Sequence, residues 1–395
     1  MIVKMMRKLF DTLRPYFEEG GRFHGLWFLF EGIESFTFTT GKVTDDAPHI
    51  RDHLDIKRLM SMVIIALIPA ILMGIYNTGL QGLIADGISV TFWGAVFRGL
   101  RVVLPIIIVS YAVGGFWEVL FAVIRKHEIN EGFLVTGMLF PLVLPPNTPL
   151  WQVALGISFG VVIGKEVFGG TGMNIFNPTL VGRAFLFFSY PSGFSGSAPY
   201  MAARSVDAVT SATPLAVASA TPAGESVTTS LMNFSLNYDL KTFLTGLYPG
   251  CIGETSAIAI LLGALFLLIT RTASWRSMAG TVIGAFLTVS LFNILAKPGS
   301  NPMMHLPFQY HILMGGFLFG TVFMVTDPVS AAMTRTGKWF YGLLIGVMTI
   351  LIRVVNPAYP EGMMLAILFG NLFAPLFDYY VVKTNMKRRL NRAQQ

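Results

Sequence analysis

Three acidic residues lie in or beside long apolar stretches, where a carboxylate is unexpected. Glu118 interrupts the run Gly-Gly-Phe-Trp-Glu-Val-Leu-Phe, Asp327 follows one apolar stretch within Thr-Asp-Pro-Val-Ser, and Asp378 follows another within Pro-Leu-Phe-Asp. Acidic side chains inside a membrane are costly, so they usually face a cavity or pair with a base. Because carboxylate oxygens are hard ligands for small cations, these residues predict a path for a cation or a proton. Asp327 and Asp378 fit a position at the water interface equally well.

Two asparagines, Asn174 and Asn177, lie in the glycine-rich stretch Gly-Gly-Thr-Gly-Met-Asn-Ile-Phe-Asn-Pro. An asparagine at a helix break often caps the next helix. Its amide also offers a donor and an acceptor, which suits the edge of a heterocycle. The glycines lack the strand–turn–helix setting of a dinucleotide fingerprint, so that interpretation is discarded.

Other catalytic motifs are missing from the sequence. It has no phosphate-binding Gly-Lys-Ser/Thr loop and no His-Glu-x-x-His, and its six histidines lack metal-ligand spacing. The single cysteine, Cys251, cannot form an internal disulfide. No metal centre is predicted.

The charged residues are too few for a soluble protein. A typical globular domain carries about 25% charged residues, whereas this chain of 395 residues carries 12%, and the 319 residues of 59–377 hold only 25 of these charges. That central part must therefore face lipid. The net charge of +7 fits basic residues at span ends. With no basic helix or aromatic-interleaved patch beside it, it does not indicate nucleic-acid binding.

A membrane-spanning helix needs about 20 apolar residues, and shorter helices are tolerated where protein buries them. This length predicts an all-α polytopic membrane protein with about ten transmembrane helices, of which the third, fifth and ninth are short. The predicted spans are 59–79, 102–124, 132–146, 151–169, 177–190, 255–270, 277–296, 310–326, 339–353 and 362–377.

The basic residues predict an orientation. They favour a cytoplasmic N-terminus, and with ten spans both termini are then cytoplasmic and the connection 191–240 is extracytoplasmic. Exceptions are Arg98, Arg101 and Arg353. The residues that support this orientation lie at or near the even-numbered connections: Arg125, Lys126, His127, Lys165, Arg271, Arg276, Arg335, Lys338 and the basic tail.

The chain also carries signs of an internal duplication. Gly114-Gly115-Phe116 is echoed by Gly315-Gly316-Phe317, and Asn177-Pro178 is echoed by Asn356-Pro357. With five spans per half, two copies must be inserted in opposite orientations. We therefore expect two inverted five-helix repeats with broken helices, an arrangement typical of transporters.

The connection after the fifth span has a different composition, because 13 of the 40 residues in 191–230 are Ser or Thr. A loop of this length within a compact protein is usually functional or disordered. The predicted organisation is a cytoplasmic N-terminal segment, a first five-helix half, an extracytoplasmic connection, a second half and a basic cytoplasmic tail. Their bounds are 1–58, 59–190, 191–254, 255–377 and 378–395.

Within this connection, residues 207–213 read Asp-Ala-Val-Thr-Ser-Ala-Thr. The stretch resembles the flavin-transferase target Asp-x-x-Ser/Thr-Gly-Ala-Thr, in which FMN is esterified through its phosphate to the last threonine. With the motifs at 114–118, 174–178 and 355–362, it makes nearly the whole chain similar to the B subunits of Na⁺-translocating NADH:quinone oxidoreductases (Na⁺-NQR), a family related to the D subunit of the Rnf complex. Ser211 stands where the motif usually has glycine, and serine is small enough for attachment to persist.

The resemblance implies cofactors and sites. Covalent FMN on Thr213 would be installed by an extracytoplasmic flavin transferase, and the motif is completed by Asp207, Thr210, Ser211 and Ala212. The other implied sites are a noncovalent riboflavin at Asn174 and Asn177, a quinone site at Gly114, Gly115 and Glu118, and Na⁺ uptake or passage at Glu118, Asp327 and Asp378.

The resemblance also implies partners. Such a protein lies in the bacterial inner membrane with five other subunits, and the complex passes electrons from NADH to a quinone, either ubiquinone or menaquinone. The resemblance implies that this subunit does not itself bind NADH.

Two alternatives remain open from the sequence. One is the related flavoprotein subunit of an Rnf-type ferredoxin:NAD⁺ oxidoreductase, against which the N-terminal extension 1–58 argues. The other is a stand-alone channel or secondary transporter, which would leave the threonine motif without a role.

Overall fold

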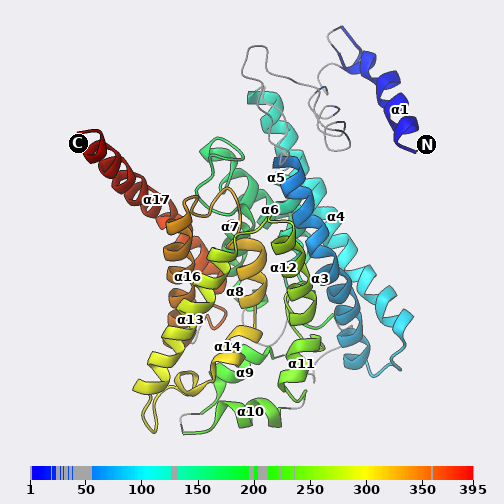
Figure 1. The fold of residues 1–395 in the computed structure, drawn as a ribbon. Coiled ribbons are helices and arrows are strands. Elements are labelled where there is room, and N and C mark those ends of the chain that lie inside the picture. Colours follow the sequence, from blue (N-terminus) through cyan, green and yellow to red (C-terminus); the bar gives the residue numbers. More distant parts are fainter. Residues whose placement is uncertain are drawn as a thin grey trace.

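The described part of the chain forms a helical bundle (Figure 1). The computed structural model describes residues 2–18, 20–23, 27, 30, 34, 38, 56–125, 132–194, 200–202, 212–222, 224–234, 236–356 and 359–394. Within these ranges all regular elements are helices. This confirms the predicted all-α fold.

Helices cover all ten predicted spans. The first half contains α3 (Ile56–Ala85), α4 (Phe92–Arg125), α5 (Gly132–Leu142), α6 (Leu150–Val162) and α7 (Pro178–Ser189). The second half contains α12 (Ala257–Ile269), α13 (Trp275–Leu295), a broken third span made of α14 (Phe308–Leu313), α15 (Phe317–Phe319) and the π-helix η4 (Gly320–Met324), then α16 (Arg335–Val355) and α17 (Met363–Ala393). The predicted ninth span, expected to be short, is a 21-residue helix.

Helix length separates these segments into two groups. Among the described residues, six helices are long and apolar enough to cross a membrane: Arg58–Ala85, Phe92–Arg125, Leu150–Phe168, Trp275–Leu295, Arg335–Val355 and Met363–Ala393. Helices α5, α7 and α12 have 11 to 13 residues. The third span of the second half breaks at Gly315, whose φ is +63°, a conformation that glycine adopts readily.

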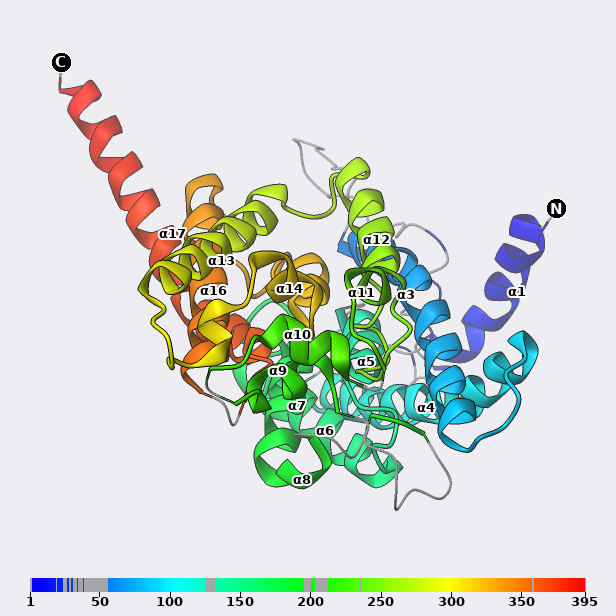
Figure 2. The ribbon, with the colours of Figure 1, turned by 90° about the horizontal axis from the view of Figure 1, so that it is seen from below.

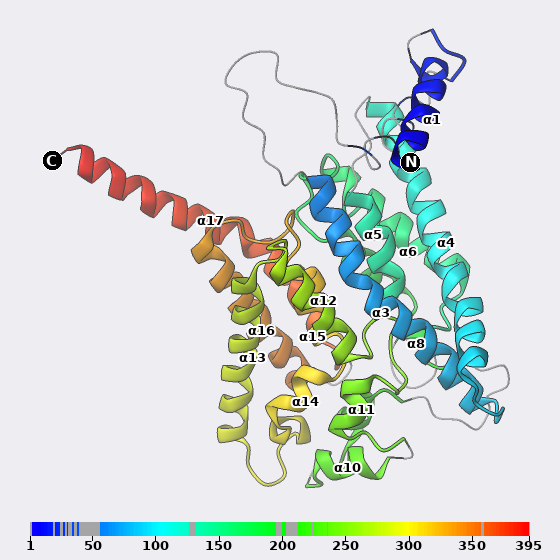
Figure 3. The ribbon, with the colours of Figure 1, turned by 45° about the vertical axis from the view of Figure 1, so that its right-hand side comes forward.

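The two halves meet as an inverted repeat. Helix α3 packs on α12 with Ala66 against Gly263 and Gly74 against Ile252, so the two first helices are antiparallel. Helix α7 packs on α17, so the two fifth helices also meet. In both halves the second helix packs on the fourth, the fourth on the fifth, and the third on the first and fifth. Figure 3 shows α3 and α12 side by side.

One of the two sequence echoes does not mark this repeat. Gly114 and Gly115 lie in α4, the second helix of its half, whereas Gly315 and Gly316 lie in the third span of the other half. Their equivalence was therefore a wrong inference. Asn177 precedes α7 and Asn356 precedes α17, so this second echo falls at corresponding places.

Both termini lie toward the same end of the bundle, and three short helices cover the opposite end (Figures 1 and 2). We call the first the terminal end and the second the loop end. The three short helices are α9 (Pro214–Ala220), α10 (Val227–Asn233) and α11 (Leu240–Thr245), and the four-residue α8 (Pro191–Phe194) follows α7. Asp239 accepts a hydrogen bond from the Thr242 N–H at 2.7 Å and caps α11. Hydrogen bonds from the side chain and the backbone of Thr242 hold the pKa of the Asp239 carboxyl below its usual range. At the terminal end, α1 (Ile2–Phe17) lies apart from the bundle and α17 runs unbroken through most of the predicted basic tail.

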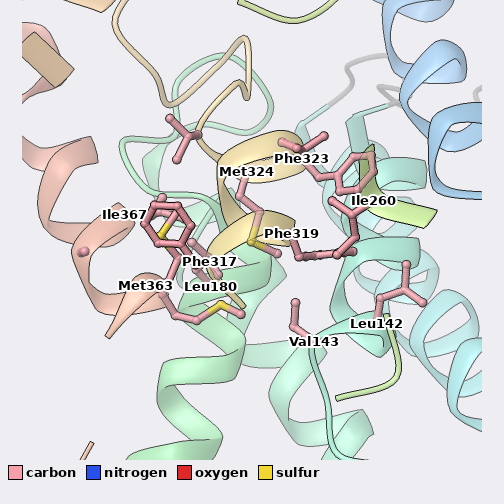
Figure 4. Packing of buried hydrophobic residues seen from close by; sticks show 14 of the residues in the cluster. Leu142, Val143, Leu180, Ile260, Phe317, Phe319, Phe323, Met324, Met363 and Ile367 are labelled. Atoms are coloured by element: carbon pink, nitrogen blue, oxygen red, sulfur yellow. The ribbon is translucent and has the colours of Figure 1, made fainter. Parts of the chain in front are cut away.

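The main apolar core forms where the halves meet around the broken span (Figure 4). The residues there come from α5, α7, α12, the broken span and α17, so both halves contribute. Figure 4 labels Leu142, Val143, Leu180, Ile260, Phe317, Phe319, Phe323, Met324, Met363 and Ile367.

A close helix pair stabilises the second half. Helices α13 and α16 cross through two small-residue motifs, Gly280-x-x-x-Gly284 and Gly342-x-x-x-Gly346. A side chain at Gly346 would collide with the carbonyl oxygen of Thr281 and lie 2.7 Å from the Ala285 nitrogen. Because lipid offers little hydrophobic drive for helix association, such close backbone contact stabilises the pair.

Gly346→Val should therefore destabilise the protein by about 1–3 kcal/mol, since the new side chain overpacks a backbone contact. Heating the detergent-solubilised protein and following its monodisperse fraction by size-exclusion chromatography measures this loss. Ile283→Val, at a position on α13 that is 43% exposed, is the matched control. Equal melting temperatures for both variants would contradict the role of the glycine crossing.

Candidate functional site

A cavity with a partly polar lining lies toward the terminal end, between the start of α3, α5 and the connection that precedes α7. Asn174, Asn177 and Asp327 line it together with Lys165 and Thr171. The structure thus brings together three of the residues singled out from the sequence. The cavity volume is about 50 Å³, and a water needs roughly 10–15 Å³, so this space holds a few waters or a partly hydrated ion.

The two asparagines shape the rim of this cavity. The Asn177 Oδ1 accepts a hydrogen bond from the Thr179 N–H at 3.0 Å and caps α7. The Asn174 Nδ2 donates to the Phe176 carbonyl at 3.0 Å, and its Oδ1 accepts from the Gly172 N–H at 3.3 Å. The capping role considered for these amides is confirmed for Asn177.

Glu118 belongs to a chain of charged side chains next to the cavity, which runs from buried groups to the exposed Arg125. It is 4% exposed and forms an ion pair with Lys165. Lys165 Nζ also lies 3.5 Å from a Glu166 oxygen, and the other Glu166 oxygen lies 3.3 Å from the Arg125 guanidinium. The charge of Glu118 is therefore balanced within the protein, and Lys165 connects it to the cavity.

The other two acids accept hydrogen bonds in turns. Asp327 lines the cavity and accepts from the Ser330 hydroxyl at 2.5 Å and the Val329 N–H at 3.3 Å. Asp378, on α17, accepts from the N–H groups of Met333 and Thr334 at 2.6 and 2.9 Å. Asp378 is not among the cavity residues, so the three acids do not form one cluster.

The two glycines of the predicted quinone site differ. A side chain at Gly114 would lie 2.5 Å from the Phe133 ring, so this glycine makes room for α5 to pack on α4. A side chain at Gly115 would meet only Phe133, at 3.7 Å, among the described residues. The helix backbone is thus accessible at Gly115 beside the exposed Phe116.

Thr213 lies at the loop end, opposite the cavity (Figure 1). It caps α9, with its Oγ1 accepting from the Ala216 N–H at 3.3 Å. The preceding carbonyl, of Ala212, accepts from the buried Tyr238 hydroxyl at 2.6 Å. The short segment 212–213 is therefore anchored, while Asp207, Thr210 and Ser211 lie outside the described residues.

A second polar pocket lies beside Thr213 and was missed from the sequence. Thr213, Cys251, Glu254 and Glu361 are among its lining residues. Arg183, on α7, binds Glu361 at 2.6 Å and donates to the Cys251 sulfur at 3.4 Å. A search for every charged residue in the sparsely charged middle would have found these groups, because a buried charge needs a partner.

The fold and the two polar sites define a class: a polytopic membrane protein built as an inverted repeat, with buried charged groups toward opposite ends of its core. The chain belongs to the NQR2, RnfD, RnfE family, whose sequence model matches residues 43–387.

Relatives from several bacteria carry one name, that of the B subunit of the Na(+)-translocating NADH-quinone reductase. The chain is 49% identical to the protein of that name from Azotobacter vinelandii, over 98% of this chain and 99% of that protein. It is 48% identical, with the same coverage, to those from Pseudomonas paraeruginosa and Klebsiella pneumoniae. The similarity spans the whole bundle and the loop end together.

Lys165→Met should destabilise the protein by about 3–5 kcal/mol, because it removes the buried ammonium group that forms an ion pair with the Glu118 carboxylate. Adding Glu118→Gln should recover most of the loss, since no uncompensated charge then remains. Thermal melting of the purified single and double variants measures both effects, with Lys241→Met at an exposed position as the control. Additive losses in the double variant would show that the pair does not couple.

Proposed function

We propose that this chain is the membrane subunit of a Na⁺-translocating NADH:quinone oxidoreductase, an enzyme complex in which it carries covalent FMN on Thr213 and passes electrons to quinone. The observation that carries this proposal is the 49% identity to a named B subunit over nearly the full length of both chains. The five other subunits of the complex would supply NADH oxidation. The Rnf-type alternative shares the family but not the name of these near relatives.

The proposed orientation places the terminal end in the cytoplasm and the loop end outside the inner membrane. Two of the three arginines that broke the charge rule, Arg98 and Arg353, have structural roles, so they do not argue against this orientation. Arg98 binds Asp86 at 2.5 Å and the Ala202 carbonyl at 2.9 Å, and Arg353 is fully buried among backbone carbonyls. Such residues are held by protein contacts and carry little information on orientation.

The surroundings of Thr213 fit covalent flavin. Its side chain is half-buried at the start of α9, and Tyr238 anchors the residue before it. The neighbouring pocket measures only about 20 Å³, so a flavin ring does not fit inside it and only the ester end would border it. The flavin, when attached, supplies one- and two-electron redox chemistry, while the chain fixes its location.

The cavity at the terminal end fits the proposed riboflavin only in part. Both polar atoms of Asn174 are engaged in the loop, and the Asn177 Oδ1 caps α7. An incoming ring would thus meet the Asn177 NH₂ group, and the surrounding side chains would have to move apart. We propose that riboflavin binds at the rim of this cavity formed by Asn174 and Asn177, and that Na⁺ enters the same cavity beside Asp327.

We propose the Gly115 face of α4 as the quinone site. Glu118 and Asp378 would be further acids of the Na⁺ path.

Thr213→Ala should abolish the covalent flavin, because the ester oxygen is lost. Denaturing gel electrophoresis of the purified complex should show flavin fluorescence at this subunit for the natural sequence and a dark band for the variant. Thr221→Ala, at a threonine beyond α9, is the control and should stay fluorescent. Fluorescence that survives Thr213→Ala would place the attachment elsewhere.

Asp327→Asn should raise the Na⁺ concentration for half-maximal quinone reduction about tenfold, since the cavity loses its carboxylate charge. NADH-driven quinone reduction, measured over a NaCl series at constant ionic strength, gives this value. The flavin band should remain. An unchanged half-maximal concentration would reduce Asp327 to a turn-forming residue.

A further inference from the structure

We propose that the pocket beside Thr213 binds a single dehydrated Na⁺ ion, with the Glu254 carboxylate as its charged ligand. This site lies at the loop end, opposite the Asp327 cavity, and would be the last protein site for the ion before the outer face. The identity of the ion rests on the proposed function, while the existence of the site rests on the contacts around Glu254.

Glu254 is the buried acid in this part of the structure whose side chain lacks a full set of partners. It is 5% exposed, and its Oε1 has no hydrogen-bond partner among the described residues. Its carboxylate packs against Gly316, where a side chain would lie 2.9 Å from Oε1. A buried carboxylate oxygen without a partner is costly, so this atom points to a donor or a cation that binds there.

The neighbouring arginines are committed to other groups. Arg183 binds Glu361 at 2.6 Å and Cys251 at 3.4 Å. Arg353 donates to the carbonyls of Glu361 and Met314, both at 3.0 Å, and to the His311 carbonyl. Neither arginine therefore donates a hydrogen bond to the Glu254 Oε1, which stays open toward the pocket.

The size and donors of the pocket select the ligand. Its volume of about 20 Å³ holds one water-sized species. The hydroxyl-bearing residue Thr255 lines it with Glu254, and hydroxyl and carboxylate oxygens are hard ligands that suit alkali and alkaline-earth cations over soft metals. The phosphodiester proposed on Thr213 would add negative charge beside Glu254 and strengthen the attraction for a cation.

The inverted repeat makes this pocket the counterpart of the cavity at the terminal end. The cavity lies beside the start of α3, the start of α5 and the connection before α7, at Met60, Gly132 and Asn177. The pocket lies beside the start of α12, the third span and the connection before α17, at Thr255, Gly315 and Glu361. The two sites thus lie beside related parts of the two halves, toward opposite ends of the bundle, and second-half residues such as Asp327 also line the cavity.

Two measurements on the purified complex test the site. The first is a pair of high-resolution cryo-electron microscopy maps, in NaCl and in choline chloride at equal ionic strength. We expect density at the Glu254 Oε1 in NaCl only, with oxygen distances shorter than a hydrogen bond. Density at hydrogen-bond distance in both salts would identify a water and overturn the proposal, as would an empty pocket in both.

The second measurement uses Glu254→Gln, which keeps the shape and removes the charge, and Glu254→Asp, which keeps the charge. The Na⁺ concentration for half-maximal quinone reduction should rise at least tenfold in the Gln variant and less in the Asp variant. Glu225→Gln, at an exposed position of the loop end, should match the natural sequence. An unchanged value for Glu254→Gln would overturn the proposal.

These outcomes separate this inference from the proposed function. A natural complex with the flavin band and Na⁺-dependent turnover, but with an insensitive Glu254→Gln variant, refutes the ion site alone. A natural complex without Na⁺ dependence refutes both. The maps need no variant, so they decide the matter even if Glu254→Gln does not fold.

Discussion

The ion pair between Arg183 and Glu361 is the interaction around which the loop end is organised. Arg183 belongs to the first half and Glu361 to the second, so the pair joins the two halves inside an apolar bundle. Arg183 is 1% exposed, and leaving it unpaired there would be far more costly than at a surface. The pair also fixes the chain just before α17 and leaves the Glu254 Oε1, next to Thr213, without an arginine hydrogen bond.

Much of the fold follows from the sequence because lipid imposes a simple rule on composition. Apolar length located all ten helical segments, and the odd number of spans per half required inverted copies. Length alone could not show that the eighth span is broken, since the sequence from Phe308 to Met324 is mostly apolar, with Gln309, His311 and Thr321 as its polar side chains besides the Tyr310 hydroxyl. The break lies at Gly315, which has a positive φ and where a side chain would lie 2.5 Å from Leu215.

The candidate sites were predictable in type but not in their partners. Asn174, Asn177 and Asp327 were recognised as polar groups in apolar surroundings, and the fold brings them to one cavity. Glu118 was recognised in the same way, yet its partner Lys165 is 47 residues away in sequence, and only the packing of α4 on α6 brings the two together. Gly114 illustrates the opposite case, because a motif residue whose type suggested ligand contact is used for helix packing.

The contacts of α12 have a mechanical consequence. This helix packs along α3 of the other half, whereas α13 packs mainly on α16 through the glycine crossing. The second half is thus divided between two groups of packed helices, joined at residues 270–274, where Arg271 adopts a φ of +55°. Positive φ is uncommon for a residue with a side chain. A movement of the α13–α16 pair relative to α12 would therefore change the backbone angles of the five residues 270–274, which connect α12 to α13.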